Sequence, residues 1–278
     1  MPSIILIRGG GDLASGIAIR LFRCGLNIAI TELHQPLAIR RTVSFAEAMY
    51  TGEMTIEGVS SIRVTDPTDL LGMLSSFGKH KIPVIEDPEC VSARLLNPLV
   101  IVDARMLKLP PNPIGYSPMQ YIGIGPGFEA GNNCQVVVET NRGHNMGRVI
   151  HQGATSLDTC IPQGNPERVI RANHTGIITA CLEIGESIKS GQPIAEIIPD
   201  ESSNQHASRY PINSPLSGIL RGILHPGIHV NQGMKVGDVD PVNTSEIIHL
   251  VSDKALSVGG GVLEAMLATP EIRARLWV

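Results

Sequence analysis

Ile4-Ile-Leu-Ile-Arg-Gly-Gly-Gly-Asp-Leu-Ala-Ser-Gly16 is the stretch from which the predicted fold follows. Its first four residues form a short apolar run, which predicts a strand buried on both faces of a parallel sheet. From Leu13 to Cys24 apolar residues recur at helical spacing, and Gly25 supplies a C-terminal stop. The glycine turn between strand and helix matches the dinucleotide-binding pattern G-x-G-x-x-G/A. The stretch therefore predicts a Rossmann-like strand, turn and helix.

An acidic residue completes this pattern. Asn27 to Thr31 is predicted to be the next strand and leads into Glu32, 21 residues after Gly11. A carboxylate there accepts hydrogen bonds from a ribose 2′-hydroxyl and repels a 2′-phosphate, which favours NAD over NADP. The alternative is a glycine turn that only packs the first helix on the sheet; Asp12 favours it, because its carboxylate would repel a phosphate. The residues predicted to bind NAD(P) or a similar ligand are Gly9, Gly10, Gly11, Asp12, Leu13, Ala14 and Glu32.

Composition excludes several classes of function. The 278 residues carry a net charge of −4 and no basic run, so nucleic acid is not an expected partner. Five scattered cysteines include no C-x-x-C pair, which predicts reduced thiols in a cytoplasmic protein, with neither a disulfide framework nor a metal site. The first apolar run stops at Arg8, too early for a signal peptide, and no segment is long enough to span a bilayer.

Short apolar runs alternate with helical segments up to residue 165, which predicts an α/β domain with a doubly wound parallel sheet. Polar residues follow most of the predicted strands, at the edge where such sheets bind ligands. The adjacent residues Arg40 and Arg41 suit the binding of a phosphate or carboxylate. The alternative is that they lie at the solvated start of a helix. The residues expected to line this cleft are Arg40, Arg41, Asp103, Arg105, Gly125, Gly127, Asn141 and Arg142.

Glu139 and His144 follow a predicted strand from Cys134 to Val138. They are the candidates for a catalytic acid/base pair. The alternative is a carboxylate that orients a nearby histidine for structural reasons. The sequence leaves open whether any reaction is catalysed.

A repeat with an offset of 42 residues defines a second domain. His174-Thr-Gly-Ile-Ile178 matches Leu216-Ser-Gly-Ile-Leu220, and the glycine spacing after each also matches. Two such halves are expected to interlock into a flattened barrel resembling the barrel-sandwich fold of biotinyl and lipoyl carrier domains. Residues 199–210 contain no lysine, so covalent biotin or lipoate is not expected. The predicted domains are a Rossmann-like domain at 1–165, the β domain at 166–242, and a C-terminal segment at 243–278. This segment is expected to contain a strand at 247–251, a glycine-rich turn that includes glycines 259 to 261, and a last helix that packs back on the first domain.

Taken together, these motifs resemble the YqeB family. The resemblance rests on residues 8–16, 31–47, 125–127, 139–144, 234–241 and 253–256. It departs from the family pattern at Cys160 and at Val242, where we expect glycine and arginine. The family is related in its Rossmann part to XdhC-type molybdenum cofactor chaperones.

The resemblance implies an accessory protein for the maturation of selenium-dependent molybdenum hydroxylases. Such a protein would bind a nucleotide-like or molybdopterin-type ligand in the cleft. Its implied partners are a hydroxylase client or other maturation proteins, and a homo-oligomer is also possible. The alternative function is an NAD(P)-dependent oxidoreductase acting on a small molecule, with His144 as its general acid.

Overall fold

The computed structural model describes residues 3–75, 81–157, 165–180, 182–200, 209–241 and 245–277. The sequence departures at Cys160 and Val242 lie outside these ranges. The chain divides into two compact units. Unit 1 is Met1–Pro36, Ser44–Thr159 and Val251–Val278, and unit 2 is Leu37–Val43 and Cys160–Leu250. No helix within the described ranges is long and apolar enough to cross a membrane.

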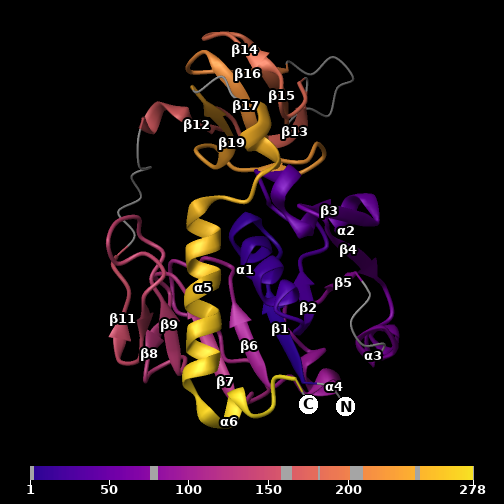
Figure 1. Ribbon diagram of the computed structural model, residues 1–278. Coiled ribbons are helices and arrows are strands. Elements are labelled where there is room, and N and C mark those ends of the chain that lie inside the picture. Colours follow the sequence, from indigo (N-terminus) through magenta and orange to yellow (C-terminus); the bar gives the residue numbers. More distant parts are fainter. Residues whose placement is uncertain are drawn as a thin grey trace. The chain divides into compact units, whose positions relative to one another are not determined.

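Unit 1 is built on a nine-stranded sheet in the order β10-β9-β7-β6-β1-β2-β5-β4-β3 (Figure 1). Parallel pairing runs from β9 to β4, and β10 and β3 add an antiparallel strand at each edge. β8 and β11 pair separately. The strands are β1 (Ile4–Arg8), β2 (Asn27–Glu32), β3 (Glu53–Ile56), β4 (Val59–Val64), β5 (Ile82–Glu86), β6 (Val100–Asp103), β7 (Gln120–Ile124), β8 (Glu129–Ala130), β9 (Val136–Val138), β10 (Val149–Ile150) and β11 (Gly153–Ala154).

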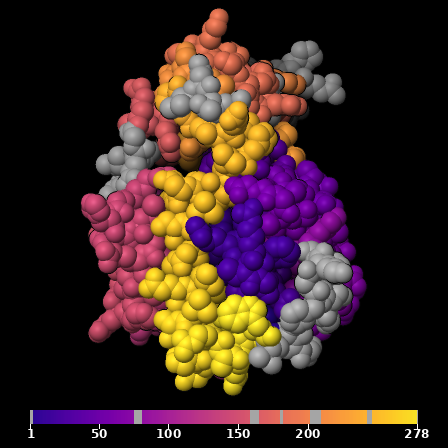
Figure 2. Space-filling view, in the orientation of Figure 1, coloured from indigo at the N-terminus to yellow at the C-terminus, as the bar shows by residue number. Residues whose placement is uncertain are grey.

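Two long helices pack against each other in unit 1 because glycines remove side-chain bulk between them. A Cβ at Gly16 would lie 2.5 Å from the Ala255 Cβ, and one at Gly259 would lie 3.2 Å from the Ile17 Cα. Figures 1 and 2 show the second helix, in yellow, beside the first, in indigo. The helical segments are α1 (Asp12–Arg23), η2 (Phe45–Glu47), α2 (Ala48–Thr51), α3 (Pro67–Ser75), α4 (Ala93–Leu96), α5 (Asp253–Ala268) and α6 (Pro270–Arg273).

The prediction of a doubly wound, Rossmann-like parallel sheet is wrong. Numbered along the chain, the parallel strands lie in the order 7-6-5-1-2-4-3, whereas the dinucleotide-binding fold has 3-2-1-4-5-6. β5 separates β2 from β4, both sheet edges are antiparallel, and residues 104–119 join β6 to β7 without a helix. Apolar runs predict that strands exist, but pairing between distant segments sets their order.

The predicted C-terminal elements also differ from those observed. Residues 247–251 were expected to be a strand, but η4 (Ser245–His249) is a 3-10 helix. The glycines from 259 to 261 were expected to form a turn, but α5 runs through them. The glycines stay helical because two of them face packed backbone: a Cβ at Gly259 would meet Ile17 and one at Gly261 would meet the Gly147 oxygen.

Unit 2 forms two four-stranded antiparallel sheets, β12-β19-β17-β14 and β16-β15-β13-β18, in place of the single biotinyl-like flattened barrel that we expected. Each sheet takes two strands from each half of the 42-residue repeat. The unit also contains η1 (Arg41–Val43) and η3 (Pro166–Arg168). Its strands are β12 (Val169–Arg171), β13 (Gly176–Ala180), β14 (Ser187–Ile188), β15 (Pro193–Pro199), β16 (Tyr210–Asn213), β17 (Gly218–Ile223), β18 (His229–Val230) and β19 (Lys235–Asp240).

The repeated glycines of unit 2 have a steric cause. A Cβ at Gly176 would lie 2.1 Å from the Ile198 carbonyl oxygen, and one at Gly218 would lie 2.2 Å from that of Asp240. Both contacts are with backbone, so only glycine lets the neighbouring strand approach this closely. Gly218 lies 42 residues after Gly176, and Asp240 lies 42 residues after Ile198. The same close approach between paired strands therefore occurs in each half of the repeat.

Candidate functional site

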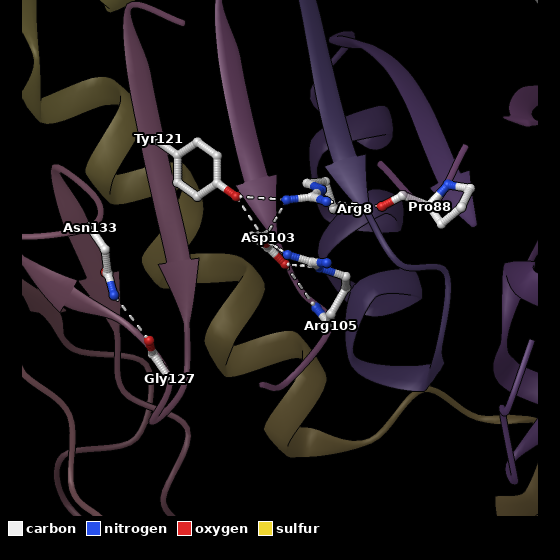
Figure 3. Close-up of polar contacts among 7 residues, drawn as sticks. All are labelled: Arg8, Pro88, Asp103, Arg105, Tyr121, Gly127 and Asn133. Carbon is white, nitrogen blue, oxygen red and sulfur yellow. Dashed lines mark hydrogen bonds and ion pairs between the residues drawn. The ribbon is translucent and has the colours of Figure 1, made fainter. Parts of the chain in front are cut away.

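A buried group of charged and polar side chains lies at the carboxyl ends of β1 and β6, where the side chain of Tyr121, the second residue of β7, also reaches. Arg8, Asp103 and Tyr121 are each less than 10% exposed. Arg8 Nη1 donates to Asp103 Oδ2 and to the Tyr121 hydroxyl, both at 3.2 Å, and the Tyr121 hydroxyl donates to Asp103 Oδ2 at 2.7 Å (Figure 3). Arg8 Nη2 donates to the Pro88 carbonyl at 3.0 Å. These bonds fix the guanidinium plane from both sides.

Arg105 joins this group from the loop after β6. Its Nε and Nη2 donate to the two oxygens of Asp103 at 2.8 and 2.6 Å. Burial lowers the pKa of Arg105, but the Asp103 carboxylate outweighs it and the net pKa is raised. Burial and the same carboxylate raise the pKa of Tyr121, so its hydroxyl stays neutral. We call Arg8, Asp103, Arg105 and Tyr121 the arginine cluster; it holds two guanidinium charges against one carboxylate.

A pocket of about 380 Å³ opens beside the arginine cluster. Arg8, Arg105 and Lys108 supply cations to its lining, and Glu89 supplies a carboxylate. The remaining lining comes from residues 107–114, which we call the proline strap, including Pro110, Pro111 and Pro113. The pocket lining therefore combines charged side chains with a stiff, mainly apolar strap that also carries Lys108 and Asn112.

The second glycine turn makes room for the proline strap. A Cβ at Gly127 would lie 2.7 Å from the carbonyl oxygens of both Leu107 and Leu109. Gly125 has a φ of +89°, which strains any other residue. Farther along, Arg94 Nε donates to the Gly115 carbonyl at 3.2 Å. The turn containing Gly125 and Gly127, predicted to line a ligand cleft, acts on the wall of this pocket through backbone packing.

The first glycine turn is filled by the chain itself. Glu32 Oε1 accepts the Gly10 amide at 2.6 Å, and the Ala46 amide donates to the Gly10 carbonyl at 2.9 Å. A Cβ at Gly10 would lie 2.9 Å from the Ala46 nitrogen. The glycine therefore admits the segment 44–47 where the dinucleotide pattern predicts a pyrophosphate. The NAD(P)-binding interpretation of this turn is wrong.

The other residues predicted at this turn have local contacts. Asp12 Oδ1 accepts the amide of Leu13 at 2.9 Å at the start of α1, and Leu13 and Ala14 are buried. Gly11 precedes α1 with open space around its would-be Cβ. Gly9 has a φ of +88°, and a Cβ there would lie 3.3 Å from Arg105 Cγ. Gly9 is thus the member of the motif that touches the arginine cluster.

The arginines predicted to hold phosphates belong to different units and have partners within their own unit. Arg40 Nη2 and Arg41 Nε, both in unit 2, donate to the carbonyls of Leu250 and Ile223 at 3.2 and 2.9 Å. Arg142, in unit 1, donates to both oxygens of Asp253 at 2.6 and 2.8 Å, and both side chains are exposed. Their observed partners are carbonyls and a carboxylate of this chain.

Glu139 anchors a loop. Its carboxylate accepts the amides of Thr140, Asn141 and Ser156, each at 2.7 Å. Burial raises the pKa of this carboxyl, but hydrogen bonds from Ser156, Asn141 and Thr140 outweigh it and leave the pKa below its ordinary value. His144, its predicted acid/base partner, is exposed. Asn141, predicted to bind the ligand, donates its backbone amide to Glu139.

Sequence reasoning found Asp103 and Arg105 but missed Arg8, Tyr121 and Glu89. One available signal was the charge of Arg8 at the end of an otherwise apolar strand. A second is visible only in the backbone: Cys90 and Met106, in the loops after β5 and β6, have φ values of +58° and +57°. Such strain in non-glycine residues concentrates at functional sites. Burial raises the pKa of the Cys90 thiol to about 11, which keeps it protonated and unreactive at neutral pH.

Among the described residues, no group of three or more His, Cys, Asp or Glu side chains is placed to hold a metal ion.

Known proteins resemble this chain to different extents. No protein-family model matches the chain. The chain is 39% identical over 269 residues to the uncharacterized protein YqeB of Escherichia coli (strain K12), covering 95% of this chain and 47% of that protein. This similarity supports the YqeB family resemblance. The chain spans about half the length of that curated relative.

Solved structures that match the chain include an aspartoacylase family protein from Mesorhizobium loti, with 10% identity, a TM-score of 0.28, and coverage of 86% of this chain and 84% of that one. A succinylglutamate desuccinylase from Silicibacter matches with 13% identity and a TM-score of 0.26 over the same shares. At these TM-scores the likeness assigns neither a fold nor an activity to this chain.

The expected functions are therefore corrected. Both the molybdenum hydroxylase accessory role and the NAD(P)-dependent oxidoreductase alternative were built on a nucleotide-type ligand in a Rossmann cleft. In this chain, residues 44–47 and Glu32 occupy the glycine turn that such a ligand needs.

Proposed function

We propose that unit 1 binds a small anionic molecule, carrying a carboxylate or a phosphate, in the pocket beside the arginine cluster. One observation carries this proposal: two buried or half-buried guanidinium groups share the single carboxylate of Asp103 next to a pocket. A buried charge without a full counter-charge is unfavourable unless a ligand or solvent compensates it. An anion in the pocket would supply the missing negative charge.

The hydrogen-bonding capacity of the cluster supports this proposal. Arg105 uses Nε and Nη2 for Asp103, and within the described part of the chain its Nη1 has no hydrogen-bond partner. Arg8 Nε is likewise buried without a partner there. Charge-assisted hydrogen bonds from guanidinium to carboxylate or phosphate are among the strongest in proteins. The position also fits, because ligands of open α/β sheets bind beyond the carboxyl ends of the strands.

The test is calorimetric titration of the full chain with 4-methylpentanoate and, separately, with inorganic phosphate. Arg105→Ala should reduce the affinity for the anion that binds by about tenfold or more, the value of one lost charge-assisted hydrogen bond. The variant leaves Arg8 and Asp103 as a balanced pair, so it should remain folded.

Arg142→Ala is the matched control, because it removes an exposed arginine that is already paired with Asp253. It should leave the affinity unchanged. The absence of binding by both anions, or equal affinity in the Arg105→Ala variant, would overturn the proposal.

A further inference from the structure

One acidic side chain shares the pocket with the arginines. Glu89 lines it and is exposed, and among the described residues no hydrogen bond or ion pair reaches its carboxylate. Arg8 and Arg105 line the same cavity with a surplus of positive charge. The pocket lining therefore carries both acidic and basic side chains, and a bound molecule could contact both.

The backbone that carries Glu89 is held on both sides. Before it, the Pro88 carbonyl accepts Arg8 Nη2 at 3.0 Å. After it, Cys90 is buried in a left-handed conformation, and Asp87 accepts the amides of Val91 and Ser92 at 2.8 and 2.7 Å. These contacts tie the Glu89 loop to the arginine cluster. The spacing between the acidic and basic groups is thus built into the fold and precedes any ligand.

The proline strap supplies a third kind of surface. Leu107, Leu109 and Ile114 line the pocket together with three prolines, and Leu109 is 77% exposed. Proline fixes φ, so this wall loses little conformational entropy when an apolar group covers it. The strap is anchored at Gly127 by close backbone packing and, just beyond its end, at Gly115 by Arg94. An apolar body resting on it would remove exposed leucine surface from water.

We propose that the anion of this site is a zwitterion of the amino-acid type with an apolar side chain. This inference rests on the proposed function. The carboxylate meets Arg105, the ammonium group meets Glu89, and the side chain covers the proline strap. A simple anion would instead place negative charge near the unpaired Glu89, and a phosphate would place more. A volume of about 380 Å³ is near the low end of the range for small-molecule sites and suits one amino acid better than a dinucleotide.

The experiment compares matched ligands that differ by one charged group. The full chain is titrated with L-leucine, with 4-methylpentanoate, which lacks the ammonium group, and with 3-methylbutylamine, which lacks the carboxylate. L-phenylalanine and 3-phenylpropionate repeat the comparison with a larger side chain. We expect each amino acid to bind about tenfold or more tightly than its deaminated acid, the effect of one added ion pair. The amine alone should bind more weakly than the amino acid.

Glu89→Gln should remove the preference for the amino acid and leave affinity for the deaminated acid equal or higher. Glu271→Gln, an exposed glutamate in α6 outside the pocket lining, is the control and should leave the preference intact. Equal affinity for amino acid and acid in the unaltered chain, or an unchanged preference in Glu89→Gln, overturns this inference. Binding of the acid that depends on Arg105 would still support the anion site, so the two proposals fail separately.

Discussion

The two halves of one sheet edge in unit 1 differ in what fills them. Beyond β1 and β2, the chain fills the space itself: the segment 44–47 packs on Gly10, and Glu32 takes the Gly10 amide. Beyond β1 and β6, the arginine cluster carries surplus positive charge beside an open pocket. Gly10 of the glycine motif lies at the closed half, whereas Gly9 borders the open half, where the charge imbalance lies. The glycine motif shows only that another group can approach the backbone closely. Whether that group is a ligand or a segment of the chain itself depends on the local charge and on an open pocket.

The largest expected effect concerns the open half. Asp103→Asn leaves two guanidinium groups without their shared carboxylate, and breaking a buried ion pair in this way costs about 3–5 kcal/mol. Urea unfolding followed by the fluorescence of Trp277, the single tryptophan, measures the loss in unit 1.

Asp238→Asn in unit 2 is the matched comparison. Arg221 contacts both Asp238 and Asp240, and Arg168 also contacts Asp238, so this group has two carboxylates for two guanidinium groups and keeps one carboxylate when Asp238 is changed. We expect a loss of about 1.5–3 kcal/mol, followed by circular dichroism. A larger loss for Asp238→Asn than for Asp103→Asn would contradict the claim that charge imbalance distinguishes the two arginine–aspartate groups.

The next effect concerns the closed half. In Gly10→Ala the new methyl group meets the Ala46 nitrogen at 2.9 Å, and relieving that backbone clash costs about 1–3 kcal/mol. Gly11→Ala has open space and a φ of −64°, so its stability should stay within about 0.5 kcal/mol of the parent. Equal effects in the same Trp277 assay would mean that the segment 44–47 does not pack on Gly10 as described.

The parts of the fold and of the site that the sequence predicts are those that depend on residues close together in the chain. The strands at β1, β2 and β5 follow from local apolar runs. The placement of Asp103 and Arg105 at a strand end follows in the same way. The order of the strands, the filling of the glycine turn by residues 44–47, and the meeting of Arg8 with Tyr121 depend on contacts between distant segments. The dinucleotide pattern failed because a peptide segment makes the same demand on Gly10 as a pyrophosphate.

Glu32, half-buried at the end of β2, and Glu139, buried directly after β9, should respond to pH with opposite signs. Burial raises the pKa of Glu32, although the Gly10 and Leu33 amides oppose this. Its contribution to stability is therefore present below the ordinary pKa of about 4.5 and is lost as pH rises through the folded-state pKa. The pKa of Glu139 is lowered, so its contribution is present above about 4.5 and is lost as pH falls through the folded-state pKa.

Urea midpoints between about pH 3 and pH 7 measure this difference. The stability advantage of the parent over Glu32→Gln should shrink as pH rises, whereas its advantage over Glu139→Gln should grow. The slope is the readout, because each substitution also removes hydrogen bonds at every pH. Slopes of the same sign would mean that the folded protein favours the ionised form of Glu32 as it favours that of Glu139. That result would contradict the description of the closed half.

The smallest effect concerns an ion pair outside both halves. Arg142 and Asp253 are exposed, and exposed pairs contribute about 0.2–1 kcal/mol, screened by salt. The Arg142 hydrogen bond lowers the pKa of Asp253, so the pair weakens at acid pH. Arg142→Ala should shift the urea midpoint slightly at low ionic strength and not at 1 M salt, while anion binding at the pocket stays unchanged. Asp253→Asn should have the same small effect. A loss of anion affinity in Arg142→Ala would extend the ligand site to this arginine and break the assignment of binding to the open half alone.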